Sequence, residues 1–217
     1  MTRDQVSKRI VEIGIVPVVR ASSPEMAIAA VNAIKAGGVP IAEITMTVPG
    51  AIDVIRTLCR EFGQDVLVGA GTVLSGDQAK ECIAAGAEFV VSPALDLGTI
   101  EAVRTAGKLI CPGALTPTEV VTAWKAGADF VKVFPCGNVG GAKYIKSLKA
   151  PFPQMRFIPT GGVSLTTASE FLEAGAEALG VGADLVDTKA LAAGDIAKVT
   201  DSARKYADIV KQFRSRK

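Results

Sequence analysis

The sequence predicts an α/β protein, a single (β/α)8 TIM barrel spanning residues 1–217 with an extra helix at its N-terminus. Short β-branched runs alternate along the chain with segments whose apolar residues follow helical spacing. Eight such runs occur, and several of the helical segments end in the same glycine phrase. Eight near-continuously apolar strands separated by helices are typical of a parallel sheet covered by helices, and the number eight favours closure into a barrel.

The individual elements follow from local signals. The predicted strands lie at residues 15–20, 41–46, 66–73, 89–93, 109–115, 130–135, 156–162 and 178–183. Ser23 and Ser75 stand where N-caps are expected for two of the helices between them. The phrases at 35–38, 84–87, 125–128 and 173–176 place a glycine just past a helix, where a left-handed residue ends it. A first helix through Ile13 and a final helix from about 195 to 213 complete the outline.

An open, doubly wound sheet is the main alternative architecture. It would more often use five or six strands and carry a GxGxxG loop after the first of them. Here the nearest phrase, GAGTV at 69–73, lacks the third glycine and follows the third predicted strand. The barrel is therefore the favoured interpretation.

Composition excludes several classes of function. Lys and Arg total 24 against 22 for Asp and Glu, which predicts neither a nucleic-acid surface nor a membrane-binding face. No membrane span or signal peptide is recognisable, so we expect a cytoplasmic protein. The chain contains no histidine, and its four cysteines stand far apart. Hydrolase triads and histidine-bound metals are thus excluded, and we expect neither a metal nor a cofactor.

One lysine occupies a position where a core residue is expected. The fifth residue after the glycine of the helix-ending phrase is Val91 in one repeat and Gly180 in another, but it is Lys132 in FVKVFP. Burying an ammonium costs several kcal/mol unless it is paired or loses its proton, and a neutral amine is a nucleophile. A lysine that snorkels from a strand end or pairs with a carboxylate only for stability is the alternative.

Other polar residues are predicted at neighbouring strand ends. Glu43 shares its strand face with Thr45 and Thr47, which makes it a candidate acid and base for Lys132. Arg20 at the end of the first strand suits a carboxylate, although an ordinary surface arginine is equally compatible with its position. Thr72 ends the third strand beside glycines that would let a ligand approach the backbone. The turn at Thr160, Gly161 and Gly162 precedes a helix and suits an anion.

Seven phrases in this order resemble the 2-keto-3-deoxy-6-phosphogluconate and 4-hydroxy-2-oxoglutarate aldolases, which are class I enzymes. They are VPVVR (16–20), EITMTVPGA (43–51), VGAGTVL (68–74), VSPALD (91–96), CPGALTPTE (111–119), VKVFP (131–135) and PTGGVSL (159–165). The resemblance implies a homotrimeric barrel that cleaves a 2-keto-3-deoxy sugar acid, 6-phosphorylated, to pyruvate and an aldehyde such as glyceraldehyde 3-phosphate.

The resemblance also implies roles for individual residues. Lys132 would form the Schiff base and Glu43 would transfer protons. Arg20 and Thr72 match positions that bind the carboxylate or nearby oxygens of the 2-oxo acid, and Gly161 and Gly162 match the phosphate loop. Pro93 and Phe134 match walls of the pocket.

The loop after the last strand departs from the family pattern. It reads VGADLVD where the family often reads VGSALV, so Ala183 replaces a hydroxyl that can bond phosphate. Asp184 adds a negative charge that would oppose a dianion, by about 1 kcal/mol or more per close pair, if it faced the site. A 4-hydroxy-2-oxoglutarate aldolase, or an aldolase for an unphosphorylated 2-keto-3-deoxy acid, therefore remains open. A phosphosugar isomerase or epimerase and a non-catalytic anion-binding barrel are more distant alternatives.

Overall fold

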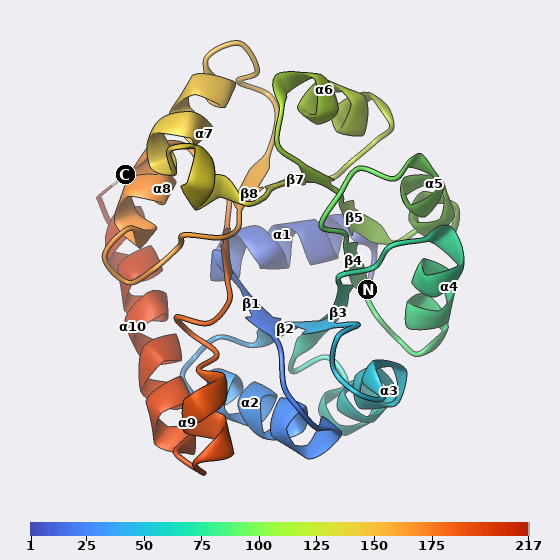
Figure 1. Cartoon of the computed structure of the whole chain (residues 1–217), viewed down its shortest axis with the longest axis vertical. Coiled ribbons are helices and arrows are strands. Elements are labelled where there is room, and N and C mark those ends of the chain that lie inside the picture. Colours follow the sequence, from blue (N-terminus) through green and yellow to red (C-terminus); the bar gives the residue numbers. More distant parts are fainter. Residues whose placement is uncertain (217) are drawn as a thin grey trace.

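The computed structural model describes residues 1–216, and in it strands and helices alternate along the chain (Figure 1). The strands are β1 (Ile15–Val19), β2 (Ile41–Thr45), β3 (Leu67–Gly71), β4 (Phe89–Val91), β5 (Leu109–Cys111), β6 (Gly113–Ala114), β7 (Val131–Val133), β8 (Phe157–Pro159) and β9 (Leu179–Val181). The helices are α1 (Arg3–Ile13), α2 (Pro24–Ala36), α3 (Ala51–Phe62), α4 (Gly76–Ala84), α5 (Leu97–Thr105), α6 (Pro117–Lys125), α7 (Ala142–Lys149), α8 (Ala168–Glu173), α9 (Thr188–Ala192) and α10 (Ile196–Arg214). A 3-10 turn, η1 (Cys136–Val139), follows β7.

Local signals in the sequence explain where these elements begin and end. The side chains of Ser23 and Ser75 accept hydrogen bonds from the backbone amides of Met26 and Gln78, as expected of N-caps. Gly86, which follows α4, has a φ of 112° and adopts the left-handed conformation that closes a helix. The prediction of alternating strands and helices is confirmed.

The strands form two parallel sheets that curl around a common interior. One sheet has the order β5-β4-β3-β2-β1-β9 and the other has the order β6-β7-β8. Only Pro112 separates β5 from β6, and Thr160 after β8 pairs in parallel with Gly180 of β9. Helices α2 to α10 surround these strands (Figure 1). The fold is thus a curled parallel sheet covered by helices.

Helix α1 lies across the interior of the curled sheets in Figure 1. Its Val6 and Ile10 are buried, and Gly14 connects it directly to the N-terminal end of β1. It therefore covers the end of the interior where the strands begin, and leaves the C-terminal ends of the strands to form a site. No helix among residues 1–216 is both long and apolar enough to cross a membrane.

Candidate active site

Lys132 lies in the middle of β7 and projects into the interior. Its backbone amide donates to the carbonyl of Pro112 at 2.9 Å, and it pairs with Gly113 on one side and Ile158 on the other. Its residue surface is only 5% exposed. The amine nitrogen Nζ lies 3.8 Å from Oε1 of Glu43 and 5.4 Å from the ring centroid of Phe134. The lysine is therefore enclosed, with one carboxylate and one aromatic face beside its amine.

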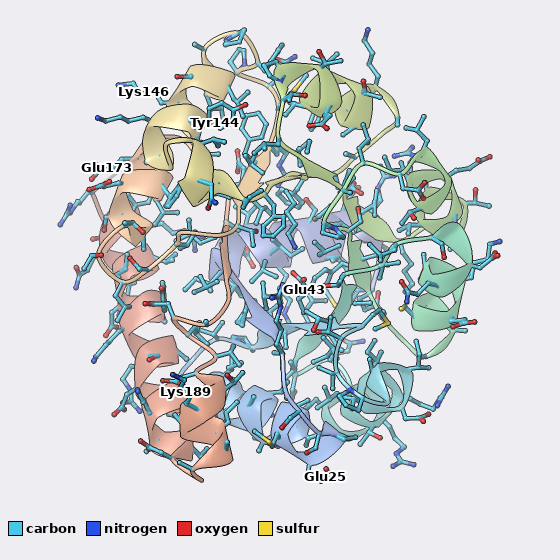
Figure 2. The ribbon with its side chains drawn as sticks, viewed as in Figure 1. Glu25, Glu43, Tyr144, Lys146, Glu173 and Lys189 are labelled. Atoms are coloured by element: carbon cyan, nitrogen blue, oxygen red, sulfur yellow. The ribbon has the colours of Figure 1, made fainter. Side chains whose placement is uncertain are left out.

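Glu43 lies in β2, near the middle of the view in Figure 2, whereas Lys146 and Glu173 project outward from helices. Its residue surface is 2% exposed, and within residues 1–216 its Oε1 atom has no hydrogen-bond partner. Burial raises the pKa of Glu43, while the positive charges of Lys132 and Arg20 act in the opposite direction. A carboxyl group with a raised pKa can both accept and return a proton closer to neutral pH.

The carboxylate of Glu43 occupies space that a side chain at Gly71 would fill. Thr45 of β2 pairs with Gly71 of β3, which brings the glycine beside Glu43 across the sheet. A Cβ atom added at Gly71 would lie 1.9 Å from Oε1 of Glu43. The sequence predicted that this glycine would let a ligand approach the backbone, but the structure fills the space with Glu43.

We therefore expect Gly71→Ala to displace the Glu43 carboxylate from Lys132 and to lower turnover about 100-fold in a folded protein, because a shift of about 1 Å at a reacting group costs this much. Steady-state kinetics and thermal melting would measure the two effects. Gly98→Ala is the matched control, since a Cβ there meets only ordinary contacts of 3.6 Å or more. Unchanged turnover in Gly71→Ala would contradict this role of the glycine.

One space borders the pair, and a second lies beyond Thr160. A small enclosed cavity of about 10 Å³, large enough for one water molecule at most, is bounded by both Glu43 and Lys132. A pocket of about 250 Å³ lies next to it and is lined by Val18, Arg20, Phe134, Thr160, Gly161, Gly182, Ala183, Val186 and Thr188. Thr160 lines both spaces. The structure thus brings five of the predicted substrate-binding residues, Arg20, Phe134, Thr160, Gly161 and Ala183, into one pocket.

Backbone amides supply hydrogen-bond donors in the two loops that border this pocket. Within residues 1–216, the amide of Gly162 in the loop after β8 donates to no protein acceptor, whereas the amide of Gly161 takes part in the parallel bridge between Thr160 and Gly180. The amides of Ala183 and Asp184 in the loop after β9 likewise donate to no acceptor in the described part of the chain. Together with the exposed guanidinium of Arg20, these donors can hold an anionic group of a ligand.

The remaining predicted residues lie outside that pocket. Thr72, directly after β3, has a φ of 58°, a strained left-handed conformation for a β-branched residue. Pro93 packs against Gly113, where an added Cβ would lie 2.3 Å from the proline carbonyl group. Gly162 lines a separate outer hollow with Gly137. Cys111, one of the four cysteines that stand far apart in the sequence, borders the small cavity beside Lys132.

Asp184 does not line the pocket that contains Arg20 and Ala183. Its Oδ2 atom accepts hydrogen bonds from the Leu165 amide at 3.2 Å and from the Tyr206 hydroxyl at 2.6 Å. Burial, together with the Asp184 carboxylate, raises the pKa of Tyr206, so the phenol retains the proton that it donates. The Asp184 carboxylate, whose charge would repel a phosphate group if it faced the pocket, is therefore bound by two hydrogen-bond donors of the protein.

An enclosed lysine amine facing a buried carboxylate, inside a curled parallel sheet, defines an enzyme of the class I aldolase type. Comparison with known proteins agrees. The family model for KDPG and KHG aldolases matches residues 6–202. The chain is 34% identical over 194 residues to the KHG/KDPG aldolase of Escherichia coli strain K12, covering 89% of this chain and 91% of that protein. The chain belongs to the KDPG and KHG aldolase family and is therefore a lyase.

One solved structure supports the same assignment, and a second shares the fold. A KDPG aldolase from Legionella pneumophila, with pyruvate captured at low pH as a covalent carbinolamine intermediate, superposes with a TM-score of 0.86 at 28% identity, covering 92% of this chain and 97% of that one. A cube-shaped protein cage designed by fusing symmetric oligomeric domains superposes with a TM-score of 0.85 at 27% identity, covering 94% of this chain and 74% of that one.

Proposed function

We propose that Lys132 forms a Schiff base with the C2 carbonyl of a 2-keto-3-deoxy sugar acid and that the enzyme cleaves this acid to pyruvate and an aldehyde. One observation carries the assignment: the Lys132 amine and the Glu43 carboxylate face each other at 3.8 Å, with side chains only 6% and 3% exposed. An enclosed amine of this kind is the nucleophile that imine chemistry requires.

The reaction follows from this pair. The lone pair of Lys132 Nζ attacks C2 and forms a carbinolamine, which loses water while Glu43 supplies and removes protons. The resulting iminium accepts the electron pair of the C3 to C4 bond as that bond breaks, and the C4 hydroxyl gives its proton to Glu43. The aldehyde leaves, the enamine is protonated at C3, and hydrolysis of the imine releases pyruvate and regenerates the lysine.

The other site residues bind the substrate. Arg20 neutralises the carboxylate of the 2-oxo acid, assisted by the Thr72 hydroxyl, and Pro93 and Phe134 form apolar walls. A 6-phosphate on the substrate is held by the amides of Gly162 and Ala183, with Thr160 and Gly161 beside them. The amides of Gly162 and Ala183 have no acceptor within the described part of the chain, and Asp184 does not line the pocket that contains Arg20, which supports a phosphorylated substrate.

Measuring pyruvate release from 2-keto-3-deoxy-6-phosphogluconate, its unphosphorylated analogue and 4-hydroxy-2-oxoglutarate side by side tests the proposal. We expect the phosphorylated acid to show the lowest KM, because only it engages the amides of both loops. Release from the unphosphorylated acid alone would show that the loops do not bind phosphate. No release from any of the three, from a folded protein, would contradict the activity itself.

We further propose that residues 1–217 form one catalytic domain built on a closed barrel of eight strands preceded by helix α1. The count treats β5 and β6 as one strand interrupted at Pro112, and the Thr160 to Gly180 bridge supports closure between β8 and β9. By resemblance, the enzyme is a cytoplasmic homotrimer. The exposed Leu74 and Leu97, at 63% and 55%, are apolar residues that a subunit contact would cover.

A further inference from the structure

The loops that follow β8 and β9 border the same pocket but are held together by few contacts. Gly161 belongs to the first loop, and Gly182 and Ala183 belong to the second. At their base the bridge between Thr160 and Gly180 fixes the spacing. Beyond that bridge, the only hydrogen bond between the two loops within residues 1–216 joins the Leu165 amide to Asp184 Oδ2.

Asp184 is itself anchored to the body of the protein. The same Oδ2 atom accepts the hydroxyl proton of Tyr206, whose residue surface is 0% exposed and which lies in α10. Helices α8, α9 and α10 lie along one side of the molecule (Figure 1). A single carboxylate thus connects the loop before α8, the loop before α9 and the buried face of α10.

The spacing of the two loops matters because each carries backbone amides that have no protein acceptor within residues 1–216. The amide of Gly162 lies on one loop, and those of Ala183 and Asp184 lie on the other. An anion that accepts from both loops binds tightly only when the loops are held at the correct distance before it arrives. Loss of the carboxylate would free the Leu165 amide and leave a buried Tyr206 hydroxyl without an acceptor, so both anchors would relax.

We propose that Asp184 is a positioning residue that fixes the spacing of these two loops, so that it strengthens binding of the phosphate end of the substrate without taking part in imine chemistry. This inference rests on the proposed function for the identity of the bound anion. In this role the Asp184 carboxylate favours phosphate binding, whereas the sequence alone suggested that its negative charge would repel a phosphate group.

Binding of glycerol 3-phosphate, measured by isothermal titration calorimetry, tests the inference independently of turnover. We expect Asp184→Ala to raise the Kd about tenfold, as for loss of a fixed binding geometry. Asp184→Asn keeps an oxygen that can accept both hydrogen bonds, so we expect it to restore the Kd to within about twofold of wild type. Borohydride trapping of pyruvate on Lys132 should be equally complete in all these variants.

Asp195→Ala is the matched control, because Asp195 caps the N-terminus of α10 and, within residues 1–216, makes no hydrogen bond or ion pair with either loop. It should lower the melting temperature and leave the Kd unchanged. If Asp184→Ala does not fold, Tyr206→Phe can be tested in its place, since it removes the hydrogen bond from the Tyr206 hydroxyl to Asp184 without adding a group. We expect its Kd to rise, though by less than tenfold.

The outcomes separate the inference from the function on which it rests. An unchanged Kd in Asp184→Ala would overturn the positioning role of Asp184. A lower Kd in both Asp184→Ala and Asp184→Asn would also overturn it, and would indicate that the Asp184 carboxylate repels the bound phosphate. A wild-type protein that does not bind glycerol 3-phosphate would also overturn it. Failure of the proposed function would appear differently, as the absence of a pyruvate adduct on Lys132 in the wild type.

Discussion

Replacing Lys132 with methionine is expected to abolish the covalent adduct that pyruvate and borohydride form on the wild-type protein and to lower turnover by about four orders of magnitude or more. Methionine retains an unbranched side chain of similar length, so the packing in β7 is largely preserved. What disappears is the amine whose Nζ lies 3.8 Å from Glu43. Intact-mass spectrometry after reduction measures the adduct, and a pyruvate-release assay measures turnover.

Lys149→Met is a stringent control for this experiment. Lys149 also pairs with a glutamate, at 3.9 Å from Glu177, and lies 5.5 Å from the ring centroid of Phe157. Burial lowers the pKa of Lys149, so this amine loses its proton more readily than an exposed lysine. It belongs to α7 and borders neither of the two spaces at the candidate active site. An adduct that persists in Lys132→Met and vanishes in Lys149→Met would overturn the mechanism.

Glu43→Gln is expected to lower turnover between about 100-fold and 10,000-fold, the range typical of losing a positioned acid and base, while pyruvate can still be trapped on Lys132. The amide has nearly the shape of the carboxyl group but cannot accept a proton from C4 or from the carbinolamine. Single-turnover kinetics would show the fall in the rate of bond cleavage. Glu177→Gln, which alters the partner of Lys149, should leave turnover unchanged.

The pH dependence of the wild type provides a second measure of Glu43. Burial raises its pKa above the ordinary value of 4.5, and the base is active only when deprotonated. Activity should therefore fall as the pH drops through a limb that lies above pH 4.5, and this limb should be absent from the residual activity of Glu43→Gln. A limb that persists unchanged in the variant would assign it to another group.

The positions of Lys132 and Glu43 could be predicted because strand geometry is a local property. Side chains alternate across a strand, so FVKVFP places Lys132 on the face shared with Phe130, whatever the neighbouring strands are. Comparison with the other repeats then shows that an apolar or small residue would be expected there. Glycine phrases that end helices are equally local, which is why Gly86 takes the predicted conformation.

Contacts between strands were less predictable. The role of Gly71 depends on its pairing with Thr45, and the register of two neighbouring strands cannot be predicted from the sequence of either strand alone. The strained backbone at Thr72 likewise had no signal in the sequence, since threonine rarely adopts a positive φ. The structure therefore changed the interpretation of Gly71 from a surface for a ligand to a space for Glu43.

By itself, the sequence determined the chemistry available to this protein, because it contains no histidine and places a lysine and a glutamate at corresponding positions of two strands. The alternation of side chains along a strand turns both residues toward the interior. Membership of an aldolase family confirms the type of chemistry. Tertiary structure alone decided where the charge of Asp184 points. That direction depends on the Leu165 amide and the Tyr206 hydroxyl, which lie 19 and 22 residues away along the chain. A hydrogen bond between such distant groups forms only after the strands have packed side by side and placed their loops together.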